Sequence, residues 1–518
     1  MTDRTRQGLG LLAAALTLGL VADVLSRTVP ARLDVALGLS AFVLVLVALS
    51  HSGIVRLPAK LAPLGVPLAL LGIALIWRDS PVLFGLNLLG SATVAALASP
   101  RLRAVGRRRA GLGDYAVGAV QLVRGAAAGA PALALGDVDW AAVTQGRRMR
   151  HAGGAAVGLA AAVPVAAVFG SLLMRADPVF DRLVVRSLDL GAVASHAGQV
   201  FFWGWLAAGL LRVICRSDGI VVAPGRRGRL GLVEVGIVLA VVDLLFLAFV
   251  AVQFRYLFGG DEQVRALAGM SYAEYARRGF FELVAVAALS LPLLLLADWS
   301  LDQQDPGRAR AFRGLALLML VLLDVMLASA LYRMRLYTVQ FGLTELRFYT
   351  FAFMGWLVLV FGWFGATVLR GRRERFGTGA LLAGWLVLAA LNLANPDGII
   401  VGVNLDRAAQ GRPFDVAYAE TLSADALPAL HQGLPRLDTA DACTAAWRLG
   451  EHWRRQLEAP HRWTIALVRA PRGPIGCGAD GREGGKAGRR SGGQAVTVRR
   501  SEAWQLANVI GHRTIRAT

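Results

Sequence analysis

Charged residues are scarce in this sequence, and the two common basic residues are used very unequally. Only 17% of the 518 residues are Asp, Glu, Lys or Arg, whereas 56% are hydrophobic. This composition excludes a disordered chain and an ordinary soluble enzyme, and it is typical of a polytopic membrane protein. Lys60 and Lys486 are the only lysines among 55 basic residues, so arginine carries the net charge of +20.

Motifs of the common enzyme and cofactor classes are also missing. The seven histidines are scattered, with no HExxH zinc motif and no nucleophile elbow. Gly485-Lys486 is followed by alanine and lacks the first glycine of a P-loop. No basic stripe is interleaved with stacking aromatic residues, so no nucleic-acid partner is predicted. We expect no cofactor and no metal site, leave the catalytic residues unknown, and lean against an enzyme.

Cysteine is limited to Cys215, Cys443 and Cys477, which form neither a CxxC motif nor a cluster with histidine. Cys443 and Cys477 can form a disulfide if the C-terminal segment is exported. The alternative is two free thiols in that segment.

Long apolar runs are what the sequence does contain. A bilayer core about 30 Å thick requires roughly 20 apolar helical residues. Eleven stretches reach about this length, namely 8–26, 33–50, 61–77, 81–99, 152–173, 197–215, 231–253, 279–298, 314–332, 348–369 and 378–395. The sequence therefore predicts an all-α fold, a polytopic transmembrane helical bundle of about 11 spans with a small helical extracytoplasmic C-terminal segment.

Arginine is concentrated in alternate connections between these stretches, the longest of which is the loop 100–151. Because cytoplasmic connections carry the excess of basic residues, the N-terminus is predicted to be cytoplasmic and the C-terminus extracytoplasmic. Within the loop, 115–123 is predicted to be a short helix, either lying on the membrane surface or linking two spans.

Composition divides the chain into five regions. They are a four-span N-terminal region (1–99), the basic loop (100–151), a seven-span core (152–396), a small helical segment (397–470) and a Gly/Arg-rich tail predicted to be disordered (471–518). In the helical segment, Ser423 is placed as a helix cap and 438–459 has helical periodicity.

Three of the acidic residues inside predicted spans are candidates for a role within the membrane. Asp243 and Asp324 stand at mid-depth, and Glu234 lies near the inner end of its span. An acid at the centre of a span costs about 2.5–3.5 kcal/mol on insertion scales. One interpretation is that Asp243 and Asp324 face each other or a hydrated cavity. The other is that each is neutral or hydrogen-bonded and only fixes helix packing.

Polar and aromatic residues gather where the later spans reach the predicted outer side, in 252–260, 272–282 and 331–351. The candidate binding residues are Arg255, Tyr256, Tyr272, Glu274, Tyr275, Arg277, Arg278, Glu282, Arg333, Arg335, Tyr337, Glu345, Arg347 and Tyr349. Arginine donates paired N–H groups to phosphates and carboxylates, which favours a site for an anionic group. In the alternative, the arginines and glutamates hold the loops together and the tyrosines belong to an interfacial belt.

The same blocks resemble a known family. QFRYLFGG, YAEYARRGFFELVAVAAL, LYRMRLYTVQFGLTELRFYTFAFMGW and NPDGIIVGVNLDRAAQGRPFDVAYAETLSADALPAL are similar to bacterial membrane proteins catalogued as domain of unknown function 4173, a relative of 4153. The resemblance covers about 150–435. It implies a multi-pass protein of the bacterial inner (cytoplasmic) membrane and supplies no established activity.

These observations favour transport or sensing, with an anion- or lipid-binding layer at the outer ends of the later spans. The alternatives are a membrane enzyme acting on a lipid-linked envelope substrate, and a non-catalytic scaffold or regulator of another membrane complex. The expected partners are the lipid bilayer, an anionic lipid or small anionic ligand, and a membrane protein.

Overall fold

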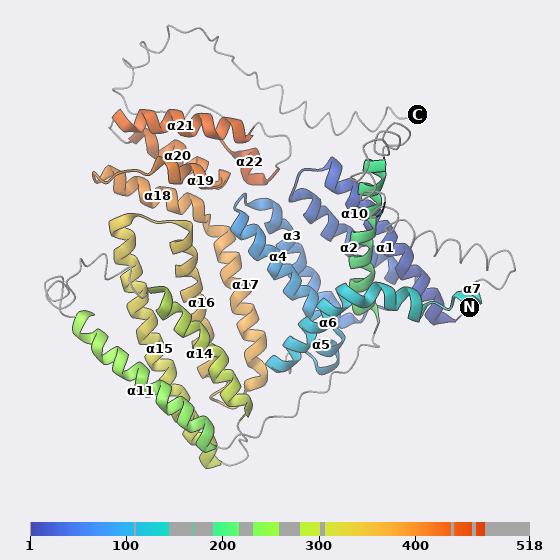
Figure 1. Ribbon diagram of the computed structural model, residues 1–518, viewed down its shortest axis with the longest axis horizontal. Helices are drawn as coiled ribbons and strands as arrows, with labels where there is room; N and C mark the ends of the chain where they lie inside the picture. The colour runs from blue at the N-terminus through green and yellow to red at the C-terminus, as the bar shows by residue number, and fades with distance from the viewer. Residues whose placement is uncertain are drawn as a thin grey trace, which may run out of the picture.

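The computed structural model describes residues 2–107, 110–143, 169, 190–216, 232–257, 280–300, 306–436, 440–457 and 463–471. The described chain is almost entirely helical and contains no β-strand. This confirms the predicted all-α fold class. The helices form an N-terminal group, a second group and a cap, arranged as Figure 1 shows.

The N-terminal group contains most of the first predicted spans. Its elements are α1 (Asp3–Thr28), α2 (Leu33–His51), the 3₁₀ segment η1 (Ala59–Leu64), α3 (Gly65–Trp77), α4 (Pro81–Leu97), α5 (Pro100–Val105), α6 (Leu112–Pro131) with its π-helical extension η2 (Ala132–Asp137), α7 (Trp140–Val143) and α10 (Leu190–Cys215). α1 packs closely along α10 because small residues line their contact. A Cβ atom added to Gly19 would lie 2.5 Å from the carbonyl oxygen of Val200.

The second group holds the largest apolar core. It is built from α11 (Leu232–Leu257), α14 (Phe280–Ser300), α15 (Pro306–Phe341), α16 (Glu345–Thr367), the 3₁₀ turn η3 (Arg373–Arg375) and α17 (Phe376–Ala394). Phe312, Phe361, Phe364 and Phe376 are among its fully buried side chains. The group meets the N-terminal helices through α17, which contacts α4.

Ten helices in the described part of the chain are long and apolar enough to cross a membrane. They are Asp3–Thr28, Leu33–His51, Ala59–Trp77, Leu112–Asp137, Gly191–Cys215, Val233–Gln253, Glu282–Ser300, Ala309–Phe341, Glu345–Thr367 and Arg373–Ala394. Nine of them coincide with predicted spans. The predicted span 81–99 is the shorter apolar helix α4, and the predicted span 152–173 lies outside the described residues except for Phe169.

Helix α6 occupies the predicted loop 100–151 and is longer than the expected helix at 115–123. Both ends of α6 lie on one face of the bundle, beside helix ends that belong to that face. At its start, Tyr115 Oη is 2.8 Å from Oγ1 of Thr378 in the first turn of α17. At its end, Asp137 binds Arg4 in the first turn of α1 and Arg216 beyond α10, both at 2.9 Å. α6 therefore lies along one face of the bundle and does not cross it, as Figure 1 shows.

The opposite face carries a small helical cap, coloured orange to red in Figure 1. The cap comprises residues 396–471, with α18 (Pro396–Ala409), α19 (Val416–Thr421), η4 (Ala424–Ala426), α20 (Leu427–Gly433), η5 (Leu434–Arg436), α21 (Ala440–Leu457) and α22 (Ile465–Arg469). Leu427, Leu430, Leu449 and Trp453 help to form its own buried core. The predicted helix at 438–459 corresponds to α21, and Ser423 caps η4 by accepting the backbone N–H of Asp425.

The predicted alternation of connections agrees with the way the helix ends sort between two faces. On the cap face, Arg27 at the end of α1 donates to Ser195 in α10, and Arg32 donates to the carbonyl of Arg78. On the face that carries α6, which we call the base face, Lys60 donates to the carbonyl of Arg103. Helix ends that the distribution of arginine assigns to the same side of the membrane therefore lie on the same face of the structure.

The stretch 331–351 was expected to connect two spans, but most of it is helical. α15 continues to Phe341 and α16 starts at Glu345, so the connection is only Gly342–Thr344. The reason is that polar side chains do not end a helix unless the backbone also turns. Here the turn comes at Gly342, whose φ of +83° suits glycine.

Candidate functional site

Arg78 ties three parts of the structure together where the cap meets the bundle. It follows α3, and its Nε donates to the carbonyl of Asn392 at 2.7 Å while Nη2 donates to the carbonyl of Leu393 at 3.2 Å. Both carbonyls belong to the last turn of α17, where a cation is favoured by the helix dipole. Nη1 lies 3.3 Å from Oδ1 of Asp425 in the cap. Its side chain therefore fixes α3, α17 and η4 to one another.

Three buried aspartates interact with one another beside this arginine, and each comes from a different segment. Asp79 follows α3, Asp397 is in the first turn of α18 and Asp425 lies in η4. They are 1%, 0% and 4% exposed, respectively. Asp425 accepts the backbone N–H groups of Asp79 at 2.6 Å and Ser80 at 3.2 Å. We call these three residues the aspartate cluster.

Two arginines and one hydroxyl complete the surroundings of the aspartate cluster. Nη1 of Arg32 lies 3.7 Å from Asp79 Oδ1, and Arg78 pairs with Asp425. Ser423 Oγ is hydrogen-bonded to Oδ2 of Asp397 and lies 3.2 Å from Oδ2 of Asp425. Asp397 also accepts the Ser423 backbone N–H at 3.1 Å. Unlike Asp79 and Asp425, Asp397 has no arginine within ion-pair distance in the described part of the chain.

Burial raises the pKa of both Asp397 and Asp425, but the neighbours act differently on the two groups. At Asp425 the backbone N–H of Asp79 and the charge of Arg78 oppose the rise in pKa. At Asp397 only the hydrogen bonds from Ser423 oppose it, and the charges of Asp425 and Asp79 raise the pKa further. The cluster therefore places its least stabilised negative charge on Asp397.

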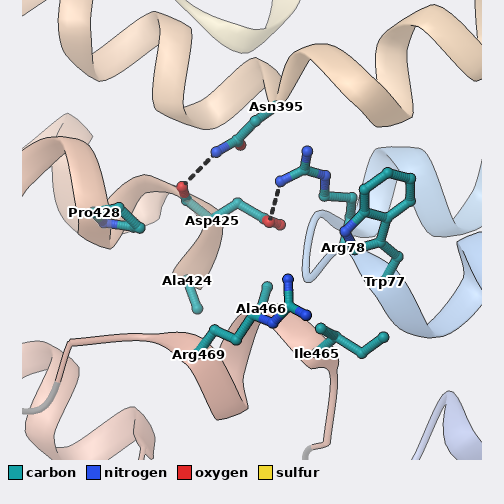
Figure 2. A pocket seen from close by; sticks show the side chains of 9 residues that line it. All are labelled: Trp77, Arg78, Asn395, Ala424, Asp425, Pro428, Ile465, Ala466 and Arg469. Carbon is teal, nitrogen blue, oxygen red and sulfur yellow. Dashed lines mark hydrogen bonds and ion pairs between the residues drawn. The ribbon is translucent and has the colours of Figure 1, made fainter.

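A cavity of about 140 Å³ opens beside the cluster, between the cap and the bundle. Figure 2 shows Trp77, Arg78 and Asn395 on one side of it and Arg469 of α22 on another, with its guanidinium directed towards the region of Asp425 and Arg78. Arg469 has neither an ion pair nor a hydrogen bond from its side chain to any described residue, and it is exposed. Arg78 in turn lies over the ring of Trp77, 5.1 Å from its centroid. We call this space the seam cavity.

A family model matches residues 65–433, which is more than half of the chain. The model describes DUF4153, a domain of unknown function. The chain belongs to the DUF4153 family. The resemblance to domain 4173 was therefore correct for the class of protein and wrong for the particular family, and the match begins well before residue 150. No curated protein and no solved structure matches the chain.

The DUF4153 region contains the whole aspartate cluster but only part of its surroundings. Arg78, Asp79, Asp397 and Asp425 fall within the matched residues. Arg469 follows them in the sequence, so the α22 wall of the seam cavity lies outside the family match. The family match assigns no function, and the long apolar helices of the described part identify an integral membrane protein.

Several predicted site residues meet at the turn between α15 and α16. Arg347 donates to the carbonyl of Gly342, and its guanidinium lies 4.1 Å from the centroid of the Tyr337 ring. The backbone N–H of Glu345 donates to Oη of Tyr418 in the cap at 2.7 Å, and burial raises the pKa of this tyrosine to about 12. These contacts hold the turn against the cap.

The cap also binds this turn through α18. Asn404 accepts the Leu343 backbone N–H and donates to the Leu343 carbonyl, both at 2.8 Å. Arg407 donates to the carbonyls of Val339 and Gln340, at 3.0 and 2.7 Å. These carbonyls end α15, where helix backbone acceptors would otherwise be unsatisfied.

The other predicted outer residues that the structure describes lie in different surroundings. Tyr349 reaches the aspartate cluster region, with Oη 3.3 Å from Oγ of Ser80. Arg333 is buried on α15, whereas Arg335 and Glu282 are exposed. Arg255 and Tyr256 belong to the last turn of α11, but their side chains lie outside the described part. Tyr272, Glu274, Tyr275, Arg277 and Arg278 also lie outside the described residues.

The intramembrane acids occupy different environments. Asp243 is 2% exposed within α11, and neither of its carboxylate oxygens has a hydrogen-bond partner among the described residues. Asp324 is exposed on α15, and Glu234 is exposed in the first turn of α11. Asp243 and Asp324 therefore form no hydrogen bond with each other among the described residues, and both interpretations of these acids stay predictions.

Sequence reasoning missed Arg78, Asp79, Asp425 and Arg469 as site residues. The first two occur in the short connection between predicted spans three and four, which looked like an ordinary hairpin. Asp425 is 346 positions away from its backbone partner Asp79. The available signal was local: an Arg-Asp-Ser sequence directly after an apolar span, and an aspartate two positions after the predicted cap Ser423.

Proposed function

We propose that the protein is a membrane sensor that binds a small anionic group in the seam cavity. The observation that carries this proposal is the position of the cavity, which is lined by arginines from both the bundle and the cap. An anion that contacts Arg78 and Arg469 would join α3 to α22. Occupancy would then change how firmly the cap is held on the bundle.

The charge of the cavity favours an anion. Asp425 neutralises Arg78 through their ion pair, whereas Arg469 has no carboxylate partner among the described residues. The guanidinium of Arg469 can therefore donate paired N–H groups to a phosphate, sulfate or carboxylate. A volume of about 140 Å³ admits such a group together with water. Sensing is favoured over transport because the cavity lies between the cap and the bundle, whereas a transport path would have to run along the membrane-spanning helices.

Binding can be tested by thermal unfolding of the purified protein in detergent, with inorganic phosphate, sulfate and acetate as probes. A ligand at a hundred times its dissociation constant stabilises the folded state by about 2.7 kcal/mol. We expect at least one of these anions to raise the melting temperature of the wild type. The rise should be lost in Arg469→Gln and kept in Arg455→Gln, which removes an exposed arginine of α21. An equal rise in both variants would refute binding at the seam.

We further propose that the cap lies outside the cytoplasm and that the N-terminus lies inside. The arginines of the base-face connections support this orientation. The disulfide of Cys443 also supports it, because disulfides persist in oxidising compartments; the predicted partner Cys477 lies outside the described residues. A single cysteine at the exposed position Gln340 should react with an impermeant maleimide added to intact cells. Reaction only after permeabilisation would reverse the orientation.

A structural scaffold is the second candidate, because the contacts of Arg78 favour it. All three nitrogens of its guanidinium group have acceptors in the protein. In this case the seam would hold the cap in place without binding a ligand, and a partner membrane protein would be the functional target. The anion titration separates the two candidates, since a scaffold predicts no stabilisation by any of the probes.

A further inference from the structure

The hydroxyl of Ser423 has more close polar contacts than its single hydrogen can satisfy if both neighbouring carboxyl groups are ionised. Its Oγ contacts Oδ2 of Asp397 and Oδ2 of Asp425, and it also accepts the backbone N–H of Asp425 at 3.3 Å. A serine hydroxyl has one hydrogen to donate and two lone pairs. If both carboxylates were ionised, Ser423 could donate to only one of them. The second carboxylate oxygen would then face the hydroxyl oxygen without a hydrogen between them.

We infer that the cap holds a proton on Asp397, which donates to Ser423 while Ser423 donates to Asp425. This assignment gives every contact of Ser423 Oγ a hydrogen: it accepts from the Asp397 carboxyl and from the Asp425 backbone, and it donates once. The site is a proton-binding site and goes beyond the proposed anion binding, on which it does not depend.

The neighbours decide which of the two carboxyl groups carries the proton. Asp425 is paired with Arg78 and accepts two backbone N–H groups, all of which stabilise an ionised carboxylate. Asp397 is completely buried, and its Oδ1 has no hydrogen-bond partner among the described residues. The proton therefore belongs to Asp397.

The charge balance of the aspartate cluster leads to the same assignment. Arg32 and Arg78 supply two positive charges, which pair with the carboxyl groups of Asp79 and Asp425, respectively. A third carboxylate would leave an uncompensated buried charge, which costs several kcal/mol. Several ionisable groups interact electrostatically with Asp397 or form ion pairs within the cluster. They are Glu345, Tyr349, Tyr418, Asp79, Asp425, Arg32 and Arg78.

One effect acts against this assignment, but it is smaller. Asp397 lies in the first turn of α18, where the helix dipole favours a negative charge. That preference is modest and is confined to the first turn of a helix. The cost of removing an unpaired carboxylate from water exceeds it. Burial accordingly raises the pKa of Asp397.

Infrared spectroscopy of the full-length protein can test the proton directly, in a buffer without phosphate or other added anions. At neutral pH, the wild-type spectrum minus that of Asp397→Asn should contain the carbonyl stretch of a protonated carboxylic acid. Asp406→Asn is the matched control, because Asp406 is exposed on the same helix. Its difference spectrum should contain only carboxylate bands.

Each outcome decides the question. The asparagine amide can donate to Ser423 as the protonated acid does, so Asp397→Asn is expected to fold. Failure of this variant to fold while Asp406→Asn folds would overturn the assignment, as would a difference spectrum with carboxylate bands alone. Because no anion is present, these results are independent of whether the seam cavity binds one.

Discussion

Replacing Arg78 by methionine should test how much this one side chain contributes to holding the cap on the bundle. The substitution keeps most of the length of the aliphatic stem and removes the guanidinium. Asp425, whose side chain is 2% exposed, would lose its cation while remaining buried. Breaking a buried ion pair by removing one partner costs about 3–5 kcal/mol. The carbonyls of Asn392 and Leu393 would also lose their donors.

We therefore expect the free energy of unfolding to fall by about 3–5 kcal/mol, which is at least a hundredfold change in the unfolding equilibrium. Denaturant titration of the purified protein in detergent micelles, followed by tryptophan fluorescence, measures this quantity. Arg455→Met is the control, since this arginine is exposed and pairs with Glu451 at 3.6 Å. Surface pairs of this kind contribute about 0–1 kcal/mol.

A double variant separates the buried charge from the packing of the stem. Arg78→Met combined with Asp425→Asn removes both charges, so it should recover much of the stability that Arg78→Met alone loses. A loss below about 1 kcal/mol in Arg78→Met would show that the pair is hydrated and would refute the reasoning. A double variant no more stable than the single one would assign the loss to packing.

Three further predictions address other parts of the structure. Because burial raises the pKa of Asp397 above its unfolded value of about 3.9, its contribution to stability should be complete below that pH. The contribution should disappear as the pH rises through the raised pKa, and unfolding of Asp397→Asn at several pH values should lack this component. Asn392→Leu should cost about 1–3 kcal/mol in denaturant titrations, because the buried Oδ1 of Asn87 loses the donor that it accepts from at 2.9 Å, although Nδ2 of Asn87 keeps its bond to the Ala74 carbonyl; a neutral result would contradict this. Gly19→Val should separate α1 from α10 by steric overlap and lower the melting temperature, whereas Gly38→Val, where a Cβ meets nothing within 4 Å, should not.

The sequence was sufficient to predict the helical bundle and the way its helix ends sort between two faces. Apolar length and the distribution of arginine act locally, and each can be recognised without knowing the neighbours of a helix. The helix cap at Ser423 was predictable for the same reason, since its partner is two residues away. The end of α15 was not, because its charged and aromatic final turns remain helical up to Gly342.

The candidate site depends on contacts that no local pattern contains. Asp79 and Asp425 meet because the ends of α3 and α17 lie side by side and the cap packs over both. Their burial converts ordinary surface residue types into a charged network. The predicted layer of arginines did not include Arg78, and its Arg347 donates to a backbone carbonyl of the turn between α15 and α16.

The length of α15 has a mechanical consequence. Its 36 residues span about 54 Å, well beyond the roughly 30 Å of a bilayer core. One end of this helix lies in the apolar core beside α11 and α14. The other end is hydrogen-bonded to Arg407 of the cap, and Asn404 of the cap binds the turn that follows. No flexible hinge separates the two ends. If the cap tilts and moves Arg407, the end of α15 moves with it. Because the helix is continuous, its packing against α11 and α14 changes as well.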